Sequence, residues 1–162
     1  MTWENPRMVV SSGSSTLRRL VLGAAVLVIV QSAIGVVVNL YLNIPPHHPG
    51  AHPANFFTGS FQSLVWSIGH GTFALVVHSI LGLALVIFAI IVAVCAICLH
   101  RRSVATCSIL AALLVIGAGF NGASFLDFNL SINLLLMALF ALGSVLCYVA
   151  MMYLLPVTQA RA

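Results

Sequence analysis

The sequence predicts an all-α protein: a four-helix transmembrane bundle with both termini in the cytoplasm, a Pro/His-rich outer loop and a short interfacial helix. Of its 162 residues, 62% are hydrophobic and only 5% are charged, whereas soluble domains carry about 25% charged residues. The apolar residues also form four runs that reach the roughly 20 residues a helix needs to cross a bilayer. These runs cover residues 20–42, 68–99, 104–122 and 130–155.

The arginines predict how these helices are oriented. The chain has no lysine, and its six arginines and two acids give a formal net charge of +4. If each of the four runs crosses the membrane once, all six arginines fall on the same side of it. They are Arg7, Arg18, Arg19, Arg101, Arg102 and Arg161. Connections rich in arginine face the cytoplasm, so we expect a multi-pass protein of the cell membrane with loops 43–67 and 123–129 outside. Arginines this localised do not form a nucleic-acid-binding surface.

The chain before the first run is polar and rich in serine, so residues 1–17 are predicted to be a mobile cytoplasmic tail. The arginine pair and the apolar run that follow look like a secretion signal. The run is longer than the 7–15 apolar residues of a signal core, however, and we expect a retained membrane anchor. The transmembrane domain then covers residues 18–156, and a short cytoplasmic tail covers 157–162.

The long connection after the first helix opens with "NIPPHHPGAHPANFF", residues 43–57, where four prolines exclude a regular helix. Three imidazoles, those of His47, His48 and His52, lie in this stretch. Neutral imidazole binds Cu(II) and Zn(II), so with His70 they form a candidate copper or zinc site. The alternative is a rigid cap over the bundle that binds no metal.

From Thr58 onward the same connection changes character, because its aromatic side chains approach helical spacing. Aromatic rings concentrate in the headgroup region of a bilayer. This part is therefore predicted to be a short interfacial helix or an outward extension of the second transmembrane helix. The rings concerned are those of Phe56, Phe57, Phe61 and Trp66.

Polar side chains lie mostly in the outer half of the predicted bundle. Counted at 1.5 Å per residue, Gln31 and His78 lie roughly 15 Å below the outer surface and Met137 about 12 Å below it. His78 either hydrogen-bonds to Gln31 or Asn133 and fixes helix packing, or it is an axial ligand of a b-type haem. In the haem interpretation Met137 is the second ligand, Gln31 lies beside the site, and Gly82 leaves room for a flat group.

Three further patterns have a structural and a functional interpretation. Asp127 and His70 either pair at the outer mouth, as in proton relays, or remain solvated and unpaired, which we favour. Cys95 and Cys98 form a Cys-x-x-Cys pattern, but within a membrane helix cysteine behaves as a small apolar residue. The glycines at 117–122 favour close helix packing.

No signature of nucleophilic catalysis is present in the sequence. The sequence therefore favours a protein that is not an enzyme, without deciding the point.

The segments VQSAIGVVVNLYLNIPPHHPGAHP, LVVHSILGLALV, NGASFLDFN and LLLMALFALGSVLCYV together resemble a family of small four-helix integral membrane proteins from actinobacteria. The resemblance covers most of residues 20–155 and implies the fold and topology, not a reaction. More distantly, Gln31 with Gly35 and His78 with Gly82 are similar to one four-helix half of haem A synthase. That family uses histidine pairs on separate helices, which implies haem at His78.

These observations predict a small polytopic integral membrane protein, in contact with bilayer lipid, that acts as a non-catalytic accessory or assembly subunit. Its partner is another membrane protein or further copies of the chain, and not a nucleic acid. The alternative is a haem- or metal-binding membrane redox protein that uses His78 below an outward-facing polar pocket.

Overall fold

The computed structural model describes residues 6–156, with side chains from Gly13 onward, as five helices without a strand. The helices are α1 (Pro6–Tyr41), α2 (Phe56–His70), α3 (Phe73–Cys98), α4 (Arg102–Phe128) and α5 (Ser131–Leu154). All except α2 contain a segment long and apolar enough to cross a membrane. The predicted all-α, multi-pass class is therefore confirmed. Of the mobile tail predicted at 1–17, residues 1–5 lie outside the described residues, as does the predicted tail at 157–162. Residues 6–17 belong to α1 and are helix, so this part of the tail prediction is wrong.

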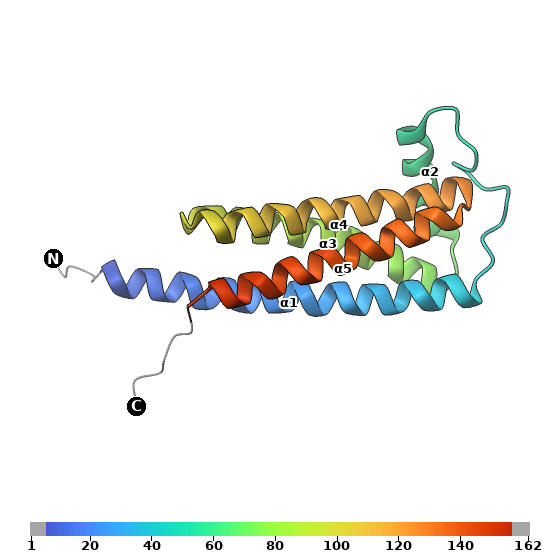
Figure 1. Ribbon diagram of the computed structural model, residues 1–162. Helices are drawn as coiled ribbons and strands as arrows, with labels where there is room; N and C mark the ends of the chain where they lie inside the picture. The colour runs from blue at the N-terminus through green and yellow to red at the C-terminus, as the bar shows by residue number, and fades with distance from the viewer. Residues whose placement is uncertain (1–5, 157–162) are drawn as a thin grey trace.

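The four long helices run side by side (Figure 1), and their contacts with one another close them into a ring. In this ring α1 packs against α3 and α5, and α4 packs against the same two helices. The short α2 packs against α3 and α4, beside the long connection 42–55. We call this end of the bundle the loop end. The opposite end, which carries Arg18, Arg19, Arg101 and Arg102, is called the arginine end.

The interior of the bundle is lined largely by small side chains, and its outer surface carries large apolar ones. Ala24, Ala89, Ala96 and Ala111 are completely or almost completely buried, whereas Leu142 on α5 is 63% exposed. Small residues let helix backbones approach closely, which is how membrane helices associate when the solvent is itself apolar. The surface of the bundle therefore matches a lipid environment.

Three helix boundaries differ clearly from the prediction. The first helix begins at Pro6 and not at 20, and two other boundaries differ because of the local backbone. The second transmembrane helix begins at Phe73 and not at 68, since Gly71 is extended (φ −69°, ψ 164°) and separates α2 from α3. The third continues to Phe128 and not to 122, so 123–128 is helix and not loop. It ends where Asn129 adopts a left-handed conformation (φ 52°) and its N–H donates to Phe125 O over 2.8 Å.

The glycines of α4 lie inside the helix and serve packing. A Cβ at Gly117 would lie 3.0 Å from the Phe140 ring, and one at Gly122 would lie 3.4 Å from Met137 Sδ. Both partners belong to α5. The close approach of α4 and α5 therefore depends on these positions having no side chain.

Arg18 holds the last turn of α5, a role that the prediction of topology alone did not assign to it. Its Nη1 donates to the carbonyl oxygens of Met152 (3.1 Å) and Leu155 (3.2 Å). Carbonyls in the last turn of a helix have no partner within the helix, and a cation there also stabilises the helix dipole.

We expect Arg18→Gln to lower the free energy of unfolding by about 1–3 kcal/mol, because hydrogen bonds from a charged donor are lost at a helix end. Arg19→Gln is the matched control, since Arg19 is the next residue and is exposed. Thermal unfolding in mild detergent, followed by circular dichroism, measures both variants. Equal losses would contradict the role assigned to Arg18.

Candidate functional site

The helix α2 turns its polar face toward the protein and its apolar face outward. Gly59, Ser60, Ser63 and Ser67 are buried, and a spacing of three and four residues places them on one side of the helix. On the other side lies the apolar ridge, which we define as Phe57 (70% exposed), Phe61 (68%) and Val65 (54%). Such a ridge suits apolar surroundings, which a bilayer or an apolar protein surface provides.

The buried serines of α2 bind the carboxylate of Asp127 at the end of α4. Ser60 Oγ donates to Oδ2 over 2.7 Å, and Ser63 Oγ donates to Oδ1 over 2.6 Å. Asp127 is only 1% exposed. The prediction that it is solvated and unpaired is wrong, because α2 covers it. A pair with His70 is not formed either, since His70 is the exposed last residue of α2.

A second hydrogen bond ties α2 to α3. Ser67 Oγ and Ser79 Oγ are 2.8 Å apart, and both residues are buried. The helix is thus fixed at two places along its polar face, to α4 through Asp127 and to α3 through Ser79. The orientation of the apolar ridge follows from these contacts.

The outer loop closes over the C-terminal end of α4. The backbone N–H of His52 donates to the backbone oxygen of Asp127 over 2.9 Å. Gly50 has a positive φ of 96° and lies directly against Gly59 and Ser63 of α2, where a Cβ would collide with both. A residue with a side chain does not fit this conformation or this space. The prolines of this loop led to the prediction of a rigid cap. Its closest contact with α2, however, is made by a glycine, Gly50.

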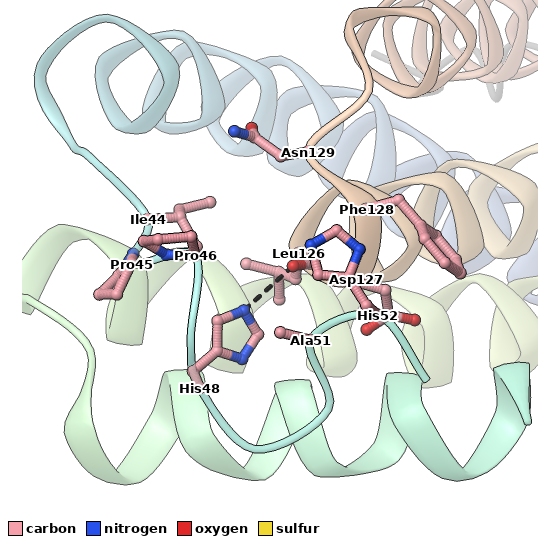
Figure 2. A pocket seen from close by; sticks show the side chains of 10 residues that line it. All are labelled: Ile44, Pro45, Pro46, His48, Ala51, His52, Leu126, Asp127, Phe128 and Asn129. Carbon is pink, nitrogen blue, oxygen red and sulfur yellow. Dashed lines mark hydrogen bonds between the residues drawn. The ribbon is translucent and has the colours of Figure 1, made fainter. Parts of the chain in front are cut away.

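His48 lies at the centre of this closure (Figure 2). Its Nδ1 is 3.0 Å from Pro49 O, and its Nε2 is 3.1 Å from Leu126 O in the last turn of α4. The ring also stacks on Trp66 of α2, with centroids 4.4 Å apart and planes inclined by 17°. The His48 side chain therefore joins the loop to α2 and α4 together.

A cavity of about 290 Å³ lies between the loop and the end of α4. It is small for a ligand site, since most ligand pockets have about 300–1,000 Å³. Its wall combines proline and aliphatic groups with two imidazoles and the Asp127 residue. The lining residues are Ile44, Pro45, Pro46, His48, Ala51, His52, Leu126, Asp127, Phe128 and Asn129.

The four histidines of the predicted metal site are not brought together. His47, His52 and His70 are exposed, and His48 is directed at carbonyl oxygens. Over residues 13–156, no group of three or more His, Cys, Asp or Glu side chains is placed to hold a metal ion. A copper or zinc site would need the loop to rearrange, and it stays a prediction.

Deeper in the bundle, Gln31 of α1 contacts His78 of α3. Gln31 Nε2 donates to His78 O over 2.9 Å and lies 3.4 Å from His78 Nε2. Two glycines make room for this pair: a Cβ at Gly35 would lie 2.9 Å from His78 Cε1, and one at Gly82 would lie 2.9 Å from Gln31 Nε2. The space beside Gly82 thus holds the Gln31 amide, and the packing interpretation of His78 has a direct structural basis.

The second predicted haem ligand lies elsewhere in the ring of helices. Met137 packs on Gly122, at the seam between α4 and α5. The helices of His78 and Met137, α3 and α5, are not neighbours in the ring but lie across it from each other within residues 6–156. Asn133 donates to Ser124 over 3.0 Å and not to His78. Haem ligation would require His78 Nε2 to leave Gln31, and it stays a prediction.

Two polar atoms of this pair, His78 Nδ1 and Gln31 Oε1, are buried without a hydrogen-bond partner in the described structure. Cys95 and Cys98 are free thiols, and Cys98 is exposed on the surface of α3.

Comparison of the chain with family models, with curated proteins and with solved structures finds no match.

Proposed function

We propose that this polytopic membrane protein is a non-catalytic accessory or assembly subunit that binds another membrane protein. One observation carries the proposal: polar side chains at several depths bridge different elements of the fold. Asp127 joins α4 to α2, Ser79 joins α3 to α2, and Gln31 joins α1 to α3. Arg18 likewise joins α1 to α5. These contacts fix how the helices are arranged, and an assembly subunit acts by presenting a fixed surface to its partner.

The surface that such a partner would use is the apolar ridge of α2. The hydrogen bonds to Asp127 and Ser79 fix the ridge before any partner arrives, and a preorganised surface loses little conformational entropy on binding. Phe57 also packs edge to face on Phe120 of α4, with centroids 6.3 Å apart and planes at 82°. Aromatic side chains at a rigid position are frequent anchors of protein interfaces.

The test is purification from native membranes in mild detergent, with measurement of complex mass, of a reduced-minus-oxidised visible spectrum and of bound metal. We expect a complex with one partner at a fixed ratio, a flat spectrum and no stoichiometric metal. Phe61→Ala should release the partner, whereas Leu142→Ala, an equally exposed apolar change on α5, should retain it. A chain that purifies alone under all conditions would contradict the proposal.

The same spectrum decides the redox alternative. Stoichiometric haem bands that disappear in His78→Ala and persist in His100→Ala would replace the accessory role by a membrane cytochrome. Bound copper or zinc with a flat spectrum would instead support a metal site formed by His47, His48 and His52.

The orientation with both termini in the cytoplasm is a further part of the proposal. It is supported by the arginines at the arginine end, because arginine-rich connections face the cytoplasm. The exposed rings of Tyr41, Phe73 and Tyr153 lie near both ends of the long helices; such rings mark the two membrane interfaces and are consistent with either orientation.

In a cysteine-free background, a cysteine at the exposed Ala54 of the loop should react with an impermeant thiol reagent in intact cells. A cysteine at the exposed Ser103, in the first turn of α4 at the arginine end, should react only after lysis. The reverse pattern would show the opposite orientation.

A further inference from the structure

The two nitrogens of the His48 ring face acceptors only. Pro49 O lies 3.0 Å from Nδ1 and Leu126 O lies 3.1 Å from Nε2. A carbonyl oxygen cannot donate a hydrogen bond, and a neutral imidazole has a single N–H, with a lone pair on its other nitrogen. Only the imidazolium, with a proton on each nitrogen, satisfies both contacts at once.

The surroundings of the ring favour a cation for two further reasons. Leu126 O belongs to the last turn of α4, where carbonyls lack helical partners and form the negative end of the helix dipole. The face of the ring stacks on Trp66 at 4.4 Å, and an indole face attracts a cation. These features are independent of each other, and each strengthens when the ring is charged.

We propose that His48 is a proton-operated latch of the outer loop. As imidazolium it holds residues 44–49 closed against the end of α4 and against Trp66. When the ring loses a proton, its single remaining N–H can serve Pro49 O or Leu126 O but not both, and the attraction of a cation to the Trp66 face is lost. The closed state is then weaker, and the first half of the loop opens more often. The cavity beneath, with Asp127 in its wall, then becomes accessible from the loop end of the bundle.

The other titratable groups around the ring are His47 and His52 in the loop and Asp127 on α4. Asp127 is held by Ser60 and Ser63, and its charge, when present, also favours a cation at His48. From α2 the ring is faced by Trp66, which does not titrate. The backbone contacts of Gly50 and His52 do not depend on a side-chain proton. They hold the second half of the loop in place, so the opening is confined to its first half.

The direction of the pH dependence follows from the closed form. Closure is strongest when the ring carries two protons, and it weakens as rising pH removes one of them, because the two carbonyl acceptors then share a single N–H. This inference concerns the loop alone and does not require the accessory role.

The test uses the full chain in lipid nanodiscs, with Trp3→Phe so that Trp66 is the single tryptophan. A nitroxide at His47→Cys, in a background without the native cysteines, reports the mobility of the loop. As pH is raised from about 5 to 8, we expect Trp66 emission to rise because the stacked ring loses its charge, and the nitroxide, which reports opening itself, to become more mobile over the same interval.

His48→Gln should remove both pH responses, because glutamine donates a hydrogen bond but does not titrate. The matched control is His52→Gln, which changes the other imidazole of the cavity wall and should keep both responses. A loop whose mobility does not change with pH would overturn the proposal, even if Trp66 emission changed, because loss of charge on the stacked ring alters the emission without any movement. So would a transition that survives in His48→Gln, since it would belong to Asp127 or to another histidine.

Discussion

Replacing Asp127 with leucine is expected to lower the free energy of unfolding by about 2–4 kcal/mol, because two buried hydroxyls lose their acceptor. Ser60 and Ser63 lie against α4 and are buried, and both donate to this carboxylate over less than 3 Å. Ser63 is completely buried and Ser60 is 9% exposed, so water has little access to the two hydroxyls. The α2 helix should consequently separate from α4 before the rest of the bundle unfolds.

Thermal unfolding in mild detergent measures the loss, and two further variants show its cause. Asp127→Asn keeps an oxygen acceptor and should cost less, since serine hydroxyls can reorient. The triple variant Asp127→Leu with Ser60→Ala and Ser63→Ala removes the acceptor and both donors. Replacing all members of a buried hydrogen-bonded group by apolar side chains often changes the free energy of unfolding little. We expect it to be more stable than Asp127→Leu alone. A triple variant that is less stable would show that the carboxylate acts in another way.

The class of fold could be predicted from the sequence because a bilayer imposes simple rules on composition. Each span must satisfy its own backbone hydrogen bonds and be apolar for about 20 residues, so apolar runs identify helices directly. The boundaries were less accurate, since they depend on single residues. The extended backbone at Gly71 and the left-handed turn at Asn129 are local features inside otherwise apolar stretches.

The surroundings of Asp127 could not be predicted, because they depend on how α2 folds back. A residue at the end of a span looks solvated when its depth alone is considered. One signal was present in the sequence: Ser60, Ser63 and Ser67 follow helical spacing opposite Phe57 and Phe61. A serine face on a helix with an aromatic face indicates that the serines bind something polar within the protein.

Gly59→Ala is expected to detach the outer loop from α2 and to lower the free energy of unfolding by about 1–3 kcal/mol, as overpacking of a tight contact does. A Cβ at this position would collide with the Pro53 ring and lie 3.3 Å from Gly50 O. The proline ring is stiff, and Gly50 is itself wedged against Ser63, so neither neighbour can move without the loop. The His48 ring should then leave Trp66, which a change in Trp66 emission in a Trp3→Phe background would show.

The matched control for this change lies in the same helix. A Cβ at Gly69 would meet no atom within 4 Å, and alanine favours a helix over glycine by about 1 kcal/mol. Gly69→Ala should therefore leave Trp66 emission unchanged and raise the stability slightly. The same chemical change thus has opposite signs at two places on α2, because one faces the loop and the other faces open space. If both variants changed stability and emission alike, the contact of Gly59 with Pro53 and Gly50 of the loop would be contradicted.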